Sequence, residues 1–190
     1  MSISLNAFRS EYKLRFNTGI YLCTVRNLVR DVSDPLNSRV SYDFNVLLPT
    51  YGNNLQRDLV WTLFQKQQLI VSLLMGRTIP KCVIVETDDR KKREVIDGKQ
   101  RLTTLISFVN NEFPIIYEGV EYFLKDFPEY MVAEIMGYII TADVYYSYGT
   151  DSSDEDFICD DAKIDLFARV NFSGTPQDES HISNIKTLKF

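Results

Sequence analysis

Apolar residues recur along this chain with two different spacings. Spacings of three and four residues, typical of one helix face, predict helices at 25–32, 61–75, 102–110, 128–137 and 164–170. Asp34-Pro35 and Gly76 follow two of these stretches and are typical of helix ends. Apolar runs rich in β-branched and aromatic residues predict strands at 42–48, 82–86, 94–96 and 139–146.

Short polar links predict two hairpins. The charged segment 87–93 joins 82–86 to 94–96, and Glu118-Gly119 joins a strand at 113–117 to one at 120–124. Hairpins interspersed with helices favour an α+β fold over a doubly wound parallel sheet. We therefore expect one domain at 24–176, preceded by an N-terminal segment at 1–23 and followed by a polar tail at 177–190.

Composition and charge narrow the range of functions. The chain has 190 residues, 45% of them hydrophobic, which is enough for one hydrophobic core. Its net charge of -5 is uneven: residues 1–95 carry 14 basic and 9 acidic side chains, and residues 96–190 carry 7 and 17. This excludes a uniformly basic nucleic-acid binder but permits a local basic surface at Arg90, Lys91, Lys92 and Arg93. The acidic stretch 151–161 lacks EF-hand spacing and is expected to be a solvated surface.

Few residues in the chain are suited to metal or thiol chemistry. His181 is the single histidine, and Cys23, Cys82 and Cys159 are widely spaced with no Cys-x-x-Cys pair. A multi-histidine metal site is excluded, no cysteine zinc site or disulfide framework is expected, and we predict no metal ligands. No apolar run approaches the roughly 18 residues that span a membrane, and the N-terminus lacks an apolar signal core. We expect a cytoplasmic protein with no membrane partner.

The segment 95–104 carries the clearest candidate chemistry. It places Asp97-Gly98-Lys99-Gln100-Arg101 between a predicted strand and a predicted helix, where free N–H groups at the helix start favour an anion. Gly98 permits close approach of a ligand, and Lys99 and Arg101 add positive charge. Thr103 and Thr104 add hydroxyl groups in the first helical turn. The segment suits a phosphate cradle, and the alternative is a capped, solvated strand–helix turn.

Two further segments have polar and aromatic residues close to predicted helix ends. Gln56-Arg57-Asp58-Leu59-Val60-Trp61 places Arg57 and the single tryptophan before a helix. The segment 167–176 places Arg169 and Asn171 at a helix end, followed by Gly174-Thr175-Pro176. Taken alone, these segments also suit an aromatic helix staple and a C-terminal helix cap.

In this order, the three segments resemble the N-terminal domain of GmrSD-type modification-dependent restriction enzymes, over about residues 24–176. The hallmark of that family is a DGQQR-type loop, here Asp97 to Arg101, with Lys99 in place of the first glutamine. A QRxxVW stretch and an F-x-R-x-N-x-x-G-T-P stretch accompany it in the family, and both are present here. Residues 69–80, which end in Ile79-Pro80, fit a further family pattern. The resemblance implies a ParB/sulfiredoxin-like fold, with a mixed sheet, hairpins and surrounding helices.

The resemblance also implies that the loop binds a nucleoside triphosphate with Mg²⁺ and supports slow hydrolysis. Asp97 and Gln100 would then position water, and Arg101 would hold phosphate, as the catalytic residues. Further nucleotide contacts would come from Arg57, Gly98, Lys99, Thr103, Thr104, Arg169 and Asn171. The implied setting is phage–bacterium conflict, as a defence component or a phage-encoded counter-defence protein in the bacterial host cell.

Two other functions stay open at the level of sequence. A non-catalytic interaction protein would mimic nuclease-bearing relatives and compete for a DNA-binding surface through Asp154, Glu155 and Asp156. A DNA-binding or DNA-nicking protein would use the basic cluster at 90–93, with DNA or a DNA-processing protein as its partner. Cleavage by the HNH mechanism of larger family members is not expected, because no HNH domain follows Gly174-Thr175-Pro176 and one histidine cannot build it.

Overall fold

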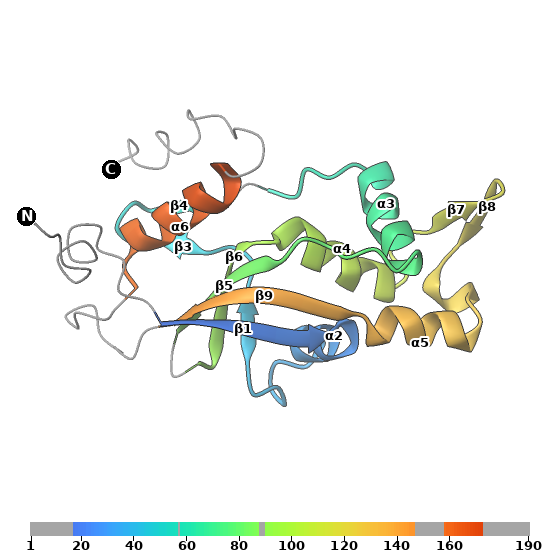
Figure 1. The fold of residues 1–190 in the computed structure, drawn as a ribbon, viewed down its shortest axis with the longest axis horizontal. Coiled ribbons are helices and arrows are strands. Elements are labelled where there is room, and N and C mark those ends of the chain that lie inside the picture. The colour runs from blue at the N-terminus through green and yellow to red at the C-terminus, as the bar shows by residue number, and fades with distance from the viewer. Residues whose placement is uncertain (1–16, 57, 88–89, 147–157, 173–190) are drawn as a thin grey trace, which may run out of the picture.

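The fold is built on a mixed five-stranded sheet (Figure 1). The computed structural model describes residues 17–56, 58–87, 90–146 and 158–172. Within them, the strand order is β1 (Asn17–Thr24), β9 (Ile139–Tyr146), β5 (Cys82–Thr87), β6 (Lys92–Asp97) and β2 (Ser41–Asp43). The β1–β9 and β5–β6 pairs are antiparallel, and the β9–β5 and β6–β2 pairs are parallel.

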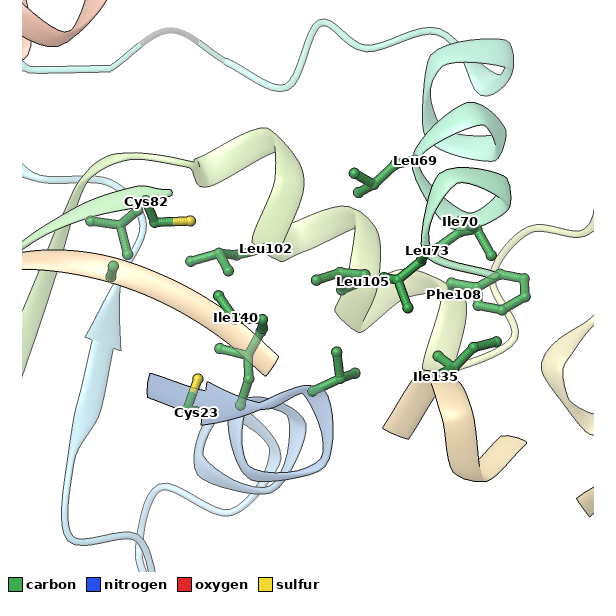
Figure 2. Packing of buried hydrophobic residues seen from close by; sticks show 14 of the residues in the cluster. Cys23, Leu69, Ile70, Leu73, Cys82, Leu102, Leu105, Phe108, Ile135 and Ile140 are labelled. Atoms are coloured by element: carbon green, nitrogen blue, oxygen red, sulfur yellow. The ribbon is translucent and has the colours of Figure 1, made fainter. Parts of the chain in front are cut away.

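Helices cover both faces of the sheet. The larger core cluster joins one sheet face, including Ile84, Val95 and Ile140, to α2 (Val25–Ser33), α3 (Leu63–Leu74), α4 (Lys99–Val109) and α5 (Glu129–Gly137). Figure 2 shows α3, α4 and α5 contributing Leu73, Leu105, Phe108 and Ile135 to this cluster. A second cluster joins the other face to α6 (Asp160–Phe172). Since neighbouring residues of β5 lie in different clusters, this strand is buried on both faces, which explains its continuous apolar run.

Smaller elements complete the described part of the chain. The hairpin of β7 (Ile115–Tyr117) and β8 (Val120–Tyr122) extends beyond α3 (Figure 1). A second small pair, β3 (Leu47–Leu48) with β4 (Asn53–Asn54), lies beside α6 (Figure 1). A 3-10 turn at Leu124–Asp126 leads toward α5. Within the described ranges, no helix has both the length and the apolar character that a membrane span requires.

The main sequence predictions of secondary structure are confirmed. The strand at 139–146 has the predicted bounds, and both predicted hairpins form. The helix predicted at 61–75 is α3, which begins after a capping box of Thr62 and Gln65 and is followed by Gly76 with φ of +68°. The α+β prediction, with a mixed sheet, hairpins and surrounding helices, is therefore confirmed.

Three predicted elements differ most from the structure, each for a local physical reason. The strand predicted at 42–48 is two strands, because the Asp43 carboxylate accepts a hydrogen bond from the Asn45 N–H at 2.9 Å and turns the chain between β2 and β3. The helix predicted from 102 begins at Lys99, since Gly98 adopts a left-handed conformation immediately before it. The helix predicted at 164–170 extends over Asp160–Phe172, with Asp160 and Asp161 in its first turn, where negative charge is favourable.

The sheet also begins earlier than the sequence suggested. The sequence predicts that residues 17–23 belong to an N-terminal segment outside the domain, yet all of β1 pairs with β9, from Asn17 opposite Tyr146 to Thr24 opposite Ile139. The Gly174-Thr175-Pro176 motif, the polar tail at 177–190 and Asp154, Glu155 and Asp156 lie outside the described residues.

Candidate functional site

The candidate site forms where β6 ends and α4 begins. Asp97 is the last residue of β6, and Gly98 then turns the chain with φ of +108°. A Cβ atom at Gly98 would lie only 2.9 Å from the Cβ of Cys82, so a larger residue has no room here. Lys99, Gln100 and Arg101 form the first turn of α4. Only glycine suits both this conformation and this packing.

Arg101 is held firmly by groups on both sides of the loop. One guanidinium nitrogen lies 2.5 Å from the Asp97 carboxylate and donates to the Lys81 carbonyl at 3.2 Å. Its Nε atom is buried and has no hydrogen-bond partner among the described residues. The Arg101 side chain is mostly covered, with 16% exposed. The pair therefore fixes a positive charge beside a carboxylate and leaves one buried donor unsatisfied.

Gln100 connects the loop to the segment that precedes α3. Its amide donates to the Asp58 carbonyl at 2.9 Å, and its oxygen accepts from the Trp61 N–H at 3.3 Å. Both ends of the side chain are thus used to hold backbone. Lys99 donates from its amino group to the Asn45 side-chain oxygen at 2.6 Å, and it forms no ion pair with any of the described residues.

A cleft of about 260 Å³ opens beside this loop. Its polar part is formed by the whole Asp97–Arg101 segment and Gln56, and its apolar part by Val60, Trp61, Ile96 and Phe167. The lining residues are Gln56, Val60, Trp61, Ile96, Asp97, Gly98, Lys99, Gln100, Arg101 and Phe167. The structure therefore brings together all five loop residues that the sequence singled out, and it adds an apolar wall.

Other predicted site residues lie elsewhere. The Thr103 hydroxyl donates to the Lys99 carbonyl at 2.7 Å, and Thr104 is buried, with 2% exposed. Arg169 forms an ion pair with Asp165 one turn earlier on α6, and it is not among the residues that line the cleft. Asn171 belongs to α6, but its side chain lies outside the described residues, as does all of Arg57.

The basic cluster at 90–93 is largely engaged within the protein. Arg93 is buried and donates to Glu86, Tyr21 and Tyr42, at 3.1, 2.6 and 3.1 Å. Burial lowers the pKa of Arg93, but Tyr42, Tyr21 and Glu86 outweigh this effect and the pKa is raised overall. Lys92 forms ion pairs with Asp43 and Glu94, and Arg90 lies over the Tyr146 ring. DNA binding by this cluster stays a prediction.

Cys82 lies directly behind the loop. It is buried against Gly98, and burial raises the pKa of its thiol to about 11, although the nearby Arg101 lowers it. The thiol therefore stays protonated at neutral pH and packs as a small apolar group. Its side chain packs against the backbone of Gly98 and so supports the loop from the protein interior.

Five cleft residues have no role predicted from the sequence: Gln56, Val60, Trp61, Ile96 and Phe167. All five lie within the three segments that carry the family motifs, so the sequence contains a signal. Their residue types give no indication of it, because a glutamine or an apolar residue near a helix end is most often ordinary packing.

The comparison with protein families shows to which family the chain belongs. The family described as "GmrSD restriction endonuclease, N-terminal domain" matches residues 45–158, which is more than half of the chain. The chain belongs to this family.

Most of the site of this GmrSD N-terminal domain lies inside the matched range, which contains every cleft residue from Gln56 to Arg101. Phe167 and the whole of α6 lie beyond it, and β1, α2 and β2 precede it. Neither the curated proteins nor the solved structures contain a match to the chain in the comparisons made.

Proposed function

We propose that the cleft binds a nucleoside triphosphate through the Asp97–Arg101 loop and supports its slow, Mg²⁺-dependent hydrolysis. The observation that carries this proposal is the cleft itself. Lys99, Arg101 and the first N–H groups of α4 lie together in it, and Gly98 leaves the backbone open to a ligand. The charges and the helix start all favour an anion. The buried, unpartnered Nε of Arg101 is a donor that a phosphate oxygen would satisfy.

The residues present also fit a bound magnesium ion. Mg²⁺ is usually held by one or two carboxylates together with substrate phosphates. The cleft lining contains one carboxylate, that of Asp97, which the sequence alone does not indicate as a metal ligand. Among the described residues there is no cluster of three or more potential metal ligands, so the phosphates would complete the coordination. When bound, the ion would neutralise phosphate charge.

Gln100 has a different role in this proposal from the one that the family resemblance implies. Both ends of its side chain hold the 58–61 backbone, so it positions Trp61 and its neighbours against the loop. Asp97 is the group that would orient a water molecule, and Arg101 holds both phosphate and Asp97.

Calorimetric titration tests the proposal directly. ATP, GTP, CTP and UTP are titrated with and without Mg²⁺ into the wild type, Arg101→Ala and Arg26→Ala, a control that removes an exposed arginine on α2. We expect saturable binding by the wild type and the control, and at least a tenfold loss in Arg101→Ala. Thermal unfolding confirms that each variant is folded. If the folded wild type binds none of the four nucleotides, the proposal is wrong.

Hydrolysis requires a separate measurement. Release of inorganic phosphate is followed for the wild type and for Asp97→Asn, which keeps the size of the side chain. We expect the variant to retain nucleotide binding and to lose most of the release. Equal release by both proteins would remove Asp97 from the reaction.

The biological setting belongs to the same proposal. We propose that the protein acts in phage–bacterium conflict within the bacterial cytoplasm, on the strength of its family. Phage plating on cells that express the wild type or Arg101→Ala tests this. A change in plating efficiency that requires Arg101 supports it, and identical plating on all strains contradicts it.

A further inference from the structure

Half of the cleft has properties that phosphate binding does not require. Val60, Trp61, Ile96 and Phe167 line it together with the charged loop. Val60 is 65% exposed and Trp61 is partly exposed, whereas Ile96 and Phe167 are almost fully buried. An exposed apolar surface within a cleft, next to a charged surface, suits a ligand with one apolar end and one anionic end.

The backbone around Trp61 is held in place by the charged loop. Gln100 accepts from the Trp61 N–H and donates to the Asp58 carbonyl, at 3.3 and 2.9 Å. The apolar and charged parts of the cleft are therefore joined by a direct side-chain link. A ligand that spans both parts would meet a surface whose two halves are already fixed relative to each other.

Gln56 adds an unsatisfied acceptor to the cleft lining. Its amide nitrogen donates to the Ile96 carbonyl at 2.8 Å and also to the Val95 carbonyl. These two acceptors fix the orientation of the amide, because a flipped side chain would place oxygen against oxygen. Its oxygen is buried, and no residue in the described part of the chain donates a hydrogen bond to it. A ligand N–H donor that reached this oxygen would remove an unfavourable buried polar group.

We propose that the Gln56–Val60–Trp61–Phe167 side of the cleft is a subsite for the base of the nucleotide. An aromatic ring would pack on Trp61 and Val60, and an N–H donor of the ring would reach the Gln56 oxygen, while the phosphates lie against Lys99 and Arg101. The ligand class is then a nucleoside phosphate rather than an inorganic phosphate or polyphosphate. This inference rests on the proposed function. It adds a binding site for the base, whose contacts distinguish the affinity for nucleotides from that for inorganic triphosphate.

The single tryptophan of the chain makes this subsite observable. ATP, GTP and inorganic triphosphate are titrated with Mg²⁺ at constant ionic strength, and both heat and Trp61 fluorescence are recorded. We expect nucleotides to bind at least tenfold more tightly than triphosphate, because a base that stacks on an aromatic side chain adds to the affinity. A change in Trp61 emission should accompany nucleotide binding and be much smaller with triphosphate.

Variants separate the base subsite from the phosphate site. Trp61→Ala and Val60→Ala should each weaken nucleotide binding by calorimetry, the former about tenfold, and leave triphosphate affinity unchanged. Phe64→Ala is the matched control, since Phe64 is 67% exposed on neighbouring α3 and does not line the cleft. If Trp61→Ala fails to fold, the nucleotide affinity of Val60→Ala tests the base subsite instead, because the exposed Val60 side chain contributes little to the core.

The outcomes distinguish the two proposals. Equal affinity for triphosphate and nucleotides, or variants that weaken both ligands equally, would overturn the base subsite and leave the loop as a phosphate site. Failure of every ligand to bind would overturn both proposals. Tighter nucleotide binding that requires Trp61 and Val60 supports both.

Discussion

Gly98 is the residue whose identity is most tightly constrained by its surroundings. Its left-handed backbone disfavours any side chain, and Cys82 occupies the space that a Cβ would need. Gly52 has a similar backbone, with φ of +70°, but no atom lies within 4 Å of the position of its missing Cβ. A side chain at Gly52 would therefore cause backbone strain alone, whereas a side chain at Gly98 would cause both backbone strain and crowding.

We predict that Gly98→Ala lowers the free energy of unfolding by about 2–4 kcal/mol, from backbone strain together with overpacking. Gly52→Ala should cost about 1 kcal/mol, because it carries only the strain. Urea unfolding of the wild type and both variants measures the difference. Equal losses would show that contact with Cys82 does not constrain the loop.

The pH dependence of stability provides a second test at the residue scale. Burial raises the pKa of the Cys82 thiol from 9.0 to about 11, so the folded state keeps its proton longer than the unfolded chain does. The stabilisation from this group is complete below pH 9 and is lost as the pH rises through 11. We predict that wild-type stability falls by about 2 kcal/mol more than that of Cys82→Ala between pH 7.5 and 10.5.

Urea unfolding at the two pH values checks this prediction. Burial also raises the pKa of Tyr42 and Cys23, and both groups are present in the wild type and the variant, so the comparison isolates Cys82. Parallel pH profiles for the two proteins would contradict the raised thiol pKa.

At the scale of elements, α6 is attached to the sheet by a buried ion pair. Lys163 on α6 lies 2.6 Å from Glu94 on β6, and their side chains are 7% and 8% exposed. Asp160 at the start of α6 accepts from the Thr50 N–H at 2.7 Å. Because α6 carries Phe167, this attachment also determines the shape of the cleft.

We predict that Lys163→Met costs about 3–5 kcal/mol, because it leaves the Glu94 carboxylate buried with only the partly exposed Lys92 as an ion-pair partner. Arg169→Met on the same helix removes an exposed ion pair with Asp165 and should cost at most about 0.5 kcal/mol. Thermal and urea unfolding of both variants measure the contrast. A loss of similar size in the two variants would show that the buried pair does not attach α6.

At the scale of the whole molecule, buried charge links strands of the sheet to one another. Arg93 on β6 contacts Glu86 on β5, Tyr42 on β2 and Tyr21 on β1, and so links four strands of the sheet. Lys92 is compensated by Asp43 and Glu94. Of the basic cluster, Arg90 and Lys91 are the most exposed residues, whereas Lys92 is partly exposed and Arg93 is buried.

We therefore predict weak DNA binding at most, with a slope of log affinity against log salt of about -2, as expected for two phosphate contacts. Fluorescence anisotropy with a duplex oligonucleotide measures this slope. Lys91→Ala should reduce its magnitude by about 1. A slope of -4 or steeper would show that all four residues contact DNA and would favour a DNA-binding function.

The sequence by itself determined the features that depend on neighbouring residues. The helix at 61–75, the strand at 139–146 and both hairpins follow from apolar spacing and turn residues within each segment. The Asp97–Arg101 loop was identified because a glycine, two basic residues and a predicted helix start follow one another directly. The family also follows from ordered local motifs.

Only the tertiary structure decided which distant segments meet. Four features bring together residues more than 35 positions apart in the chain. They are the pairing of β1 with β9, the hydrogen bonds between Gln100 and the 58–61 backbone, the position of Phe167 in the cleft, and the contact of Arg93 with Tyr21. Apolar spacing shows that a face is buried but not which partner covers it. The residues of the Asp97–Arg101 loop are therefore adjacent in the sequence, whereas the other residues of the cleft come together only when the chain folds.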